Sequence, residues 1–316
     1  INISGACFLF QFADPALRQL VQTHWGPFAV SLSEIKDVQA VLQFPDEEPA
    51  LSKLKHWQSY SSEHFLFVSD GKRYLLTGYM YDHPWQFHCR ALPDWNAEFI
   101  YYYIVEPILL DLLKTSGILV WHSAAVVRDG MAILLPGVSG SGKSTTTLNF
   151  LSLGYRFLAD DMILLRRRDD GLEAFGYETG LYLTDKSIHL LPEWEKFKQG
   201  QKRKKGTRWK HEINLTSFRP HPKAQPPLIK AVLFPQVSKG KETRLEKLTE
   251  AQVMLECLRQ PPKEFPASIL GQAAIQSQFE IYSSLASSAR SYKIYLGEDQ
   301  DHVRAVLSGL EIDSDA

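Results

Sequence analysis

Short apolar runs separated by turns fill the chain up to about residue 95. The runs at 7–12, 28–32, 65–68 and 74–80 predict strands, and Asp70-Gly71 between the last two predicts a hairpin turn. Four of the seven tryptophans lie in this part, namely Trp25, Trp57, Trp85 and Trp95. Because aromatic side chains bury large areas, we interpret them as the core of a small α+β unit, with an aromatic recognition surface as the alternative.

The pattern becomes helical after Pro93-Asp94. Apolar residues recur at helical spacing from 96 to 116, Gly117 predicts the helix end, and Pro107 predicts a kink or a restart. We therefore place a domain boundary here. The N-terminal domain is 1–95, a candidate for substrate recognition, and the second domain is 96–316.

The second domain alternates strands and helices, which indicates an α/β fold. Strands are predicted at 118–127, 131–136, 155–166, 228–234 and 291–296, and helices at 143–153, 249–259 and 272–288, with a further helix at the end. The basic stretch 196–211 has neither pattern and is predicted to be a long mobile loop.

Charge and composition exclude several classes of protein. The 316 residues are 44% hydrophobic and carry 35 basic and 36 acidic side chains, so no net charge favours nucleic acid or an anionic membrane. No run approaches the ~20 uncharged apolar residues of a membrane span. The three cysteines have no metal-ligand spacing and suit free thiols in a reducing cytoplasm. We expect a soluble cytoplasmic protein without a signal peptide.

The most informative motif follows the strand 131–136. It matches G-x-x-x-x-G-K-[ST] and consists of Gly137, Val138, Ser139, Gly140, Ser141, Gly142, Lys143 and Ser144, followed by Thr145. Consecutive N–H groups and the start of a helix bind phosphate oxygens, Lys143 reaches the β- and γ-phosphates, and Ser144 binds Mg²⁺. The sequence therefore predicts a site for a nucleoside triphosphate.

Two adjacent acids follow one helix and one turn later. Asp160 and Asp161 stand within an otherwise apolar run, where carboxylates are costly unless they bind metal or take part in chemistry. Alternation along a strand predicts that their side chains point to opposite faces, so that one can hold Mg²⁺ while the other acts on a hydroxyl. A solvated pair at a strand end is the alternative.

His122 lies in the middle of the predicted strand 118–127. The turn at Asp129-Gly130 predicts that this strand pairs antiparallel with the one feeding the phosphate loop. A lone histidine on a strand is usually structural, so the residues alone leave a functional and a structural role open.

Three segments together resemble a known family. They are His122-Ser-Ala-Ala-Val-Val, Leu135-Pro-Gly-Val-Ser-Gly-Ser-Gly-Lys-Ser-Thr and Leu158-Ala-Asp-Asp, and their order and spacing match the HPr kinase/phosphorylase-like kinases. The resemblance covers about residues 97–190. It is nearest to divergent members that phosphorylate ribosomally made peptides, including lasso-peptide precursors.

This resemblance implies a fold shared with phosphoenolpyruvate carboxykinase, with ATP as donor and Mg²⁺ as metal. By position, Ser144 and Asp160 would bind Mg²⁺, Asp161 would orient or deprotonate the acceptor hydroxyl, and His122 would support that Asp or contact the phosphoryl group. Lys143 would act in catalysis as well as in binding. Which of the two acids is the base stays open from the sequence.

The chain also departs from the family pattern. The Glu-x-Arg-Gly-rich signature of the bifunctional enzymes corresponds to Tyr177-Glu178-Thr179-Gly180, which lacks the Arg, so the reverse phosphorolytic reaction is not expected. Lys186 is a candidate replacement cation, with an exposed loop lysine as the alternative. The basic stretch is a linker, a lid over phosphates or an acidic peptide, or a nucleic-acid contact.

We therefore expect an ATP-dependent kinase that phosphorylates a serine of a peptide or small protein, as a monomer or a homo-oligomer. A small-metabolite kinase and a non-catalytic nucleotide switch are the alternatives. No nucleic acid or membrane partner is expected. The peptide enzyme needs an extended groove, whereas the metabolite kinase needs only an enclosed pocket.

Overall fold

A computed structural model of the whole chain describes residues 2–3, 6–12, 15–29, 40–44, 57–62, 65–70, 74–79, 85–89, 97–176, 180–205, 208–220, 225–238, 242–259 and 271–310. The chain divides into two compact units. The first comprises Ile1–Gly117 and Lys263–Ser277, and the second comprises Ile118–Pro262 and Gln278–Ala316. Each unit is described by itself. Among the described residues, no helix has both the length and the apolar character that a membrane crossing requires.

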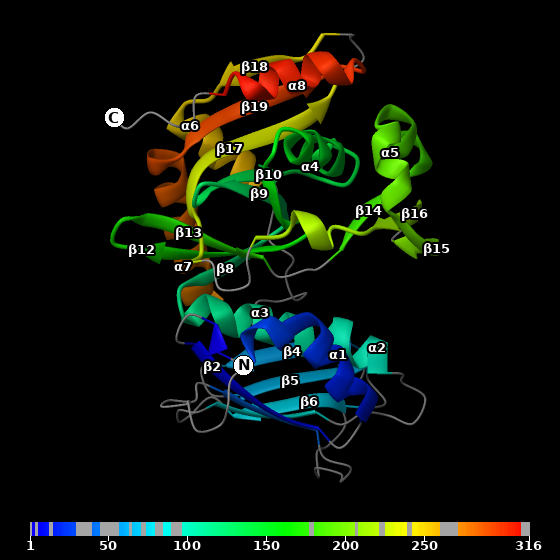
Figure 1. Cartoon of the computed structure of the whole chain (residues 1–316). Helices are drawn as coiled ribbons and strands as arrows, with labels where there is room; N and C mark the ends of the chain where they lie inside the picture. Colours follow the sequence, from blue (N-terminus) through cyan, green and yellow to red (C-terminus); the bar gives the residue numbers. More distant parts are fainter. Residues whose placement is uncertain are drawn as a thin grey trace. The chain divides into compact units, whose positions relative to one another are not determined.

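The first unit contains a seven-stranded sheet with the order β1-β2-β3-β7-β6-β5-β4 (Figure 1). Its strands are β1 (Asn2–Ile3), β2 (Ala6–Phe12), β3 (Ala40–Phe44), β4 (Trp57–Ser62), β5 (Phe65–Asp70), β6 (Tyr74–Tyr79) and β7 (Trp85–Cys89). The strands predicted at 7–12, 65–68 and 74–80 are confirmed as β2, β5 and β6. Gly26–Phe28 forms the 3-10 turn η1. The rest of the predicted strand 28–32, Gly71 and Trp95 lie outside the described residues.

The helix predicted at 96–116 is confirmed, in three consecutive parts. They are α2 (Ala97–Ile100), the π-helical turn η3 (Tyr101–Val105) and α3 (Glu106–Thr115). Pro107 falls in the first turn of α3, where a helix does not require the missing N–H, and the irregularity is the π turn just before it.

This helix belongs to the first unit, so the boundary predicted near residue 95 is displaced to Gly117. The cause is its packing against α1 (Pro15–Trp25). Trp25 is fully buried and donates its Nε1–H to the hydroxyl of Tyr101 at 3.0 Å, and the His24 ring stacks on Tyr101. Trp25 is thus a core residue, as interpreted, while the side chains of Trp57, Trp85 and Trp95 lie outside the description.

The second unit is built on a nine-stranded sheet. The order β11-β9-β10-β17-β13-β12-β8 is extended by β19, which pairs with β17, and by β18, which pairs with β19. The strands are β8 (Ile118–Trp121), β9 (Ser123–Arg128), β10 (Met131–Pro136), β11 (Arg156–Ala159), β12 (Ile163–Arg168), β13 (Gly171–Gly176), β17 (Leu228–Val237), β18 (Arg244–Lys247) and β19 (Arg290–Leu296). The predicted antiparallel pairing of the strand before the loop with its predecessor is confirmed by β9 and β10.

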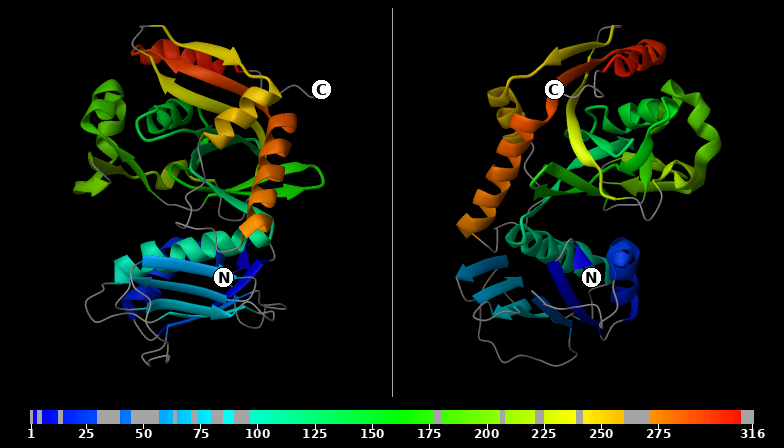
Figure 2. Two further views of the ribbon diagram at one scale, coloured as in Figure 1. Left: turned by 180° about the vertical axis from the view of Figure 1, so that it is seen from behind. Right: turned by 60° about the vertical axis from the view of Figure 1, so that its left-hand side comes forward.

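Helices cover both faces of this sheet, as Figures 1 and 2 show. They are α4 (Lys143–Ser152) and α8 (Gln300–Ser308) on one face, and α6 (Glu250–Leu258) and the part of α7 (Gly271–Ser288) from Gln278 onwards on the other. A further helix, α5 (Asp185–Leu190), lies beside the smaller sheet described below. Along β10, Ile133 and Leu135 pack with α4 and α8, whereas Ala132 and Leu134 pack with α6 and α7. Burial on both faces explains why β10 is a continuous apolar run. A Thr249 capping box starts α6 at the predicted position.

Two predicted strands are each interrupted at a polar residue. The strand 118–127 divides into β8 and β9 around His122, and the strand 155–166 divides into β11 and β12 around Asp160 and Asp161. The prediction that these residues lie mid-strand was therefore wrong. The reason is a change of partner: β8 pairs with β12, whereas β9 pairs with β10 and β11.

The basic stretch 196–211 was predicted to be a long loop without regular structure. That prediction was wrong, because this stretch is the greater part of an antiparallel hairpin. Its strands are β15 (Lys198–Lys205) and β16 (Arg208–Ile213), and β16 also pairs with β14 (Leu181–Leu183) to form a three-stranded sheet. Lysine-rich strands lack the apolar alternation by which strands are recognised, and here backbone pairing holds them together.

Candidate active site

The phosphate-loop motif joins the end of β10 to the start of α4. Gly140 and Gly142 have φ angles of +89° and +108°, which side chains other than glycine rarely adopt. Gly142 precedes the first residue of α4, and a Cβ atom there would collide with Leu296. A Cβ at Gly137 would collide with the Ser141 side chain. These glycines therefore have geometric reasons to be present.

Lys143 is folded back over this loop. Its Nζ donates hydrogen bonds to the carbonyl oxygens of Gly137 and Val138, the second at 3.3 Å, and its side chain is buried. Burial lowers the pKa of Lys143, and the negative charges of Asp160 and Asp161 oppose that shift. The ammonium thus lies at the loop with two carboxylates near enough to affect it.

Ser144 and Asp160 form a direct pair. The Ser144 hydroxyl donates to Oδ1 of Asp160 at 3.1 Å, with Oδ2 at 3.3 Å, and Asp160 is 2% exposed. Burial raises the pKa of Asp160 to about 7, the charge of Asp161 acts in the same direction, and Lys143 opposes it. A bound cation would stabilise the ionised form of this buried carboxylate, and both partners offer the oxygen atoms that Mg²⁺ prefers. The pair therefore fits Mg²⁺, with the remaining ligands supplied by phosphates and water.

Asp161 points to a different neighbour. Its Oδ1 lies 3.7 Å from Nε2 of His122, and both side chains are partly exposed. The neighbouring His122 ring is the main influence that lowers the pKa of Asp161, to about 2, and the charges of Lys210 and Lys143 act in the same direction. The two acids thus contact different residues, but they lie between strands, so the alternation on which the predicted opposite orientation was based does not apply to them.

The two strand interruptions explain why these residues meet. Trp121 at the end of β8 pairs with Ile163 at the start of β12, and Ala125 of β9 pairs with Ala159 at the end of β11. The break between β8 and β9 therefore lies opposite the break between β11 and β12 in the sheet. His122 is carried by one break and both acids by the other.

A cavity of about 410 Å³ connects the loop to these side chains. Of the predicted site residues it is lined by His122, Ser139, Gly140, Gly142, Lys143, Ser144, Thr145 and Asp161. Lys186 also lines it, from an exposed position in the first turn of α5, so it is on a helix rather than in a loop. Asp160 is hydrogen-bonded to Ser144, and Val138 is 62% exposed.

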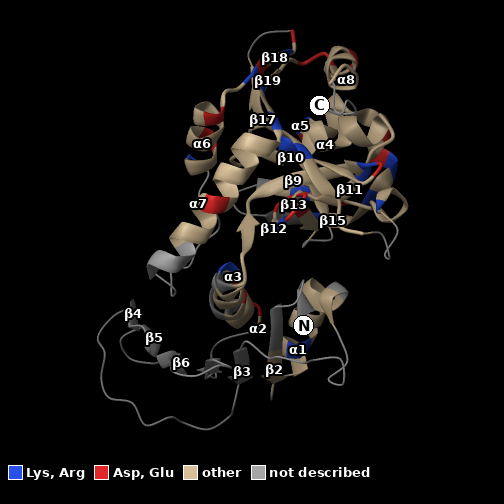
Figure 3. Cartoon of the chain, turned by 90° about the vertical axis from the view of Figure 1, so that its left-hand side faces the viewer, with Lys and Arg blue, Asp and Glu red and all other residues tan. Residues whose placement is uncertain are grey.

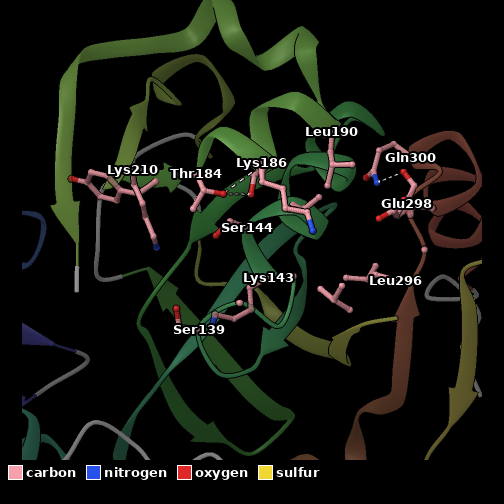
Figure 4. Close-up of a pocket in the computed structure, with 18 of the residues that line it drawn as sticks. Ser139, Lys143, Ser144, Thr184, Lys186, Leu190, Lys210, Leu296, Glu298 and Gln300 are labelled. Carbon is pink, nitrogen blue, oxygen red and sulfur yellow. Dashed lines mark hydrogen bonds between the residues drawn. The ribbon is translucent and has the colours of Figure 1, made fainter. Parts of the chain in front are cut away.

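Sequence reasoning missed the other wall of this cavity. Lys210 and Tyr182 come from the three-stranded sheet, and Leu296, Glu298 and Gln300 come from the end of the chain (Figure 4). Lys210 was assigned only to a basic stretch, since nothing in its neighbourhood distinguishes it from the other lysines. If the hairpin had been recognised, strand alternation would have placed Lys210 on the same face as Glu212. Glu212 pairs with the cavity residue Tyr182 in the sheet.

The basic hairpin is tied to α5 by one acid. Asp185 accepts from Lys202 Nζ at 2.7 Å, and His211 Nε2 lies 3.0 Å from its other oxygen. Asp185 is next to Lys186, and His211 is next to Lys210. This ion-paired cluster therefore positions the backbone of both cavity lysines. Glu178 lies outside the described residues.

Charges elsewhere on the second unit are largely paired. Figure 3 shows acidic and basic residues interspersed on α6 and around β12 and β13. In that second group, buried Glu173 bonds to both Arg166 and Arg168.

No protein-family model matches the chain. Among curated proteins, it is 39% identical over 51 residues to an HPr kinase/phosphorylase from Geobacillus sp. (strain WCH70), covering 16% of each chain. It is 29% identical over 102 residues to that of Peptoclostridium acidaminophilum, covering 25% of this chain and 33% of the relative. That of Lactobacillus acidophilus is 36% identical over 66 residues, covering 21% and 20%. Over the matched part, the chain is HPr kinase-like.

The matches leave much of both proteins uncovered, since the chain spans between 16% and 33% of the length of these HPr kinase/phosphorylases. Among solved structures, the Hpr(Ser) kinase/phosphatase from Coxiella burnetii matches with a TM-score of 0.26 and 16% identity, covering 41% of this chain and 72% of that one.

Proposed function

We propose that this chain is an ATP-dependent kinase that transfers the γ-phosphoryl group to a serine hydroxyl of a peptide or small protein, in the modification of ribosomally made peptides. The observation that carries the proposal is a cavity lined by residues of the phosphate-loop motif and by Asp161 with His122, in which Ser144 is hydrogen-bonded to Asp160. The similarity to proteins named HPr kinase/phosphorylase supports the kinase class.

The loop and the lysines would bind the triphosphate. The N–H groups at the start of α4 and the Lys143 ammonium supply positive charge at one point, and Lys143 would exchange its two carbonyl partners for phosphate oxygens. Lys186 and Lys210 add charge from the other wall. Phosphoryl transfer passes through a loose transition state with charge on the equatorial oxygens, so positioned cations are the main contribution a protein can make.

Ser144 and Asp160 would hold the metal. Bound Mg²⁺ neutralises negative charge on the β- and γ-phosphate oxygens. The 3.1 Å hydrogen bond between Ser144 and Asp160 already brings both oxygen ligands to one point.

Asp161 would act on the acceptor. The serine hydroxyl oxygen forms a bond to the γ-phosphorus, the bond from phosphorus to the β,γ-bridging oxygen breaks, and its electron pair stays on ADP. The hydroxyl proton passes to Asp161. A pKa of about 2 keeps this carboxylate ionised at neutral pH and able to accept the hydroxyl hydrogen bond, and the loose transition state demands little basicity. His122 would hold the carboxylate in place.

The test is phosphate transfer by the full chain with Mg²⁺-ATP. Serine-containing peptides and a panel of hydroxylated metabolites are incubated separately, and mass spectrometry looks for the gain of one phosphate. We expect transfer to peptides that Lys143→Ala abolishes. Phosphorylation of metabolites alone would support the small-metabolite kinase instead, and ATP binding without any transfer would support the nucleotide switch.

A further inference from the structure

The cavity extends away from the reacting groups to the junction between β19 and α8. This end is lined by Leu296, Gly297, Glu298, Gln300 and Val303. Figure 4 shows Lys143 and Ser144 between Lys210 on one side and Glu298 and Gln300 on the other. The transfer chemistry described above uses none of the residues at the β19–α8 junction.

The junction has a fixed geometry. The Gly297 N–H donates to Thr243 Oγ1 at 3.0 Å, and the Ser238 N–H donates to the Leu296 carbonyl at 2.9 Å. Gln300 Nε2 donates to the Glu298 carbonyl at 3.0 Å. The backbone on both sides of Glu298 is therefore held by hydrogen bonds.

The same junction is connected to the phosphate-loop helix. Buried Asn149 of α4 donates to Gln300 Oε1 at 2.9 Å and accepts from Arg304 of α8 at 3.2 Å. The distance between the loop and the junction is therefore set by direct contacts between α4 and α8. Such preorganisation suits a ligand that reaches both places at once.

Charge is distributed unevenly along the cavity. Lys143 lies at the loop and Lys210 on the side away from the junction (Figure 4), whereas Glu298 is exposed and, among the residues that the structure describes, its carboxylate has neither an ion pair nor a hydrogen bond. An acid in a cavity for a polyanion would repel phosphates placed beside it. Within a ligand that carries a triphosphate, it suits a part that is neutral and donates hydrogen bonds.

We propose that the β19–α8 junction is the nucleoside subsite, in which the Glu298 carboxylate accepts hydrogen bonds from the ribose hydroxyls of ATP. Leu296 and Val303 also line this end but are only 6% and 1% exposed, so recognition here falls to the ribose rather than to the base. This inference rests on the proposed function, because it assumes that the triphosphate lies at the loop. The γ-phosphate then points towards Asp161 and Lys210, and the nucleoside points away from them.

The experiment compares three ligands with the full chain in the presence of Mg²⁺: ATP, 2′,3′-dideoxy-ATP and inorganic tripolyphosphate. Equilibrium dialysis gives the Kd of each for wild type, Glu298→Ala and Glu298→Gln. Glu250→Ala is the matched control, since Glu250 is an exposed acid in the first turn of α6 and does not line the cavity.

We expect Glu298→Ala to weaken ATP binding about tenfold, the size of a lost hydrogen bond to a charged group, and Glu298→Gln to weaken it less. Tripolyphosphate should bind Glu298→Ala as well as wild type or slightly better, because a repelling charge is removed. Wild type should prefer ATP over the dideoxy analogue about tenfold, and Glu298→Ala should lose that preference.

The inference would be overturned if Glu298→Ala still preferred ATP over 2′,3′-dideoxy-ATP. It would also be overturned if Glu298→Ala weakened the binding of ATP and of tripolyphosphate equally. Failure of the proposed function looks different. In that case wild type binds neither ATP nor tripolyphosphate, or Lys143→Ala binds both as wild type does.

Discussion

Replacement of Gly142 by alanine is expected to lower the free energy of unfolding of the second unit by about 2–5 kcal/mol. Two costs add. A φ of +108° costs a residue with a Cβ about 1–2 kcal/mol, and the new Cβ collides with Leu296 while lying 3.5 Å from Val237. Leu296 is 6% exposed and packed in the core, so it cannot move freely, and such overpacking costs about 1–3 kcal/mol.

Gly154 provides the matched control. It follows the other end of α4 with a φ of +88°, but a Cβ there meets nothing within 4 Å, so Gly154→Ala should cost only about 1–2 kcal/mol. Urea unfolding of the full chain, followed by near-ultraviolet circular dichroism, measures both variants. A Leu296→Ala background should recover about 1–2 kcal/mol of the Gly142→Ala loss, since the colliding side chain is gone. Equal destabilisation by the two glycine replacements, or no recovery in that background, would refute the steric reasoning.

Four further outcomes are expected. Asp161→Asn should lower kcat about 10²–10⁴-fold and leave the Kd for ATP unchanged. The control is Asp169→Asn, which replaces an exposed acid outside the cavity and should change neither quantity. An unaltered single-turnover rate for Asp161→Asn would exclude the base role. Lys210→Met should lower kcat about tenfold or more by removing positive charge near the transferred group, and wild-type kcat would show that Lys210 only fills space. Asp185→Asn should speed hydrogen exchange across the hairpin and lower kcat with little change in Tm; unchanged exchange would mean that the ion pairs do not hold the strands. Burial raises the pKa of Cys257 to about 12, so folding should lose stability between about pH 9 and pH 12, where the unfolded thiol ionises and the folded one does not. Other groups also titrate in this range, so the expected signature is a difference: the stability of wild type should fall with pH more steeply than that of Cys257→Ala, by up to ~1.4 kcal/mol per pH unit, and equal alkaline slopes in the two proteins would contradict this.

The local sequence pattern was sufficient to predict many of the strands and helices of the second unit. The apolar run before the loop, the glycine spacing within it and the Thr249 capping box each act within a few residues, and the structure has β10, α4 and α6 where they predict them. The similarity to HPr kinase/phosphorylases likewise agrees with the resemblance drawn from His122, the loop and the paired acids.

The errors of prediction share one physical origin. His122 and the paired acids were assigned to continuous strands because apolar residues continue on both sides of them. The strands break because β8 and β9 pair with different neighbours, which is a property of the sheet. The basic hairpin was missed for a related reason, since β15 is defined by its pairing with β16 and not by apolar alternation.

The sequence by itself determined the chemistry that is available: a glycine-rich loop, a lysine, a hydroxyl and two acids, because backbone freedom and functional groups belong to individual residues. Only the tertiary structure decided which of these groups face one another. Ser144 contacts Asp160 rather than Asp161, and Lys210 and Glu298 reach the same cavity from residues far apart in the chain. Such contacts depend on how sheets curl and helices pack, and these are interactions between distant segments that no local pattern encodes.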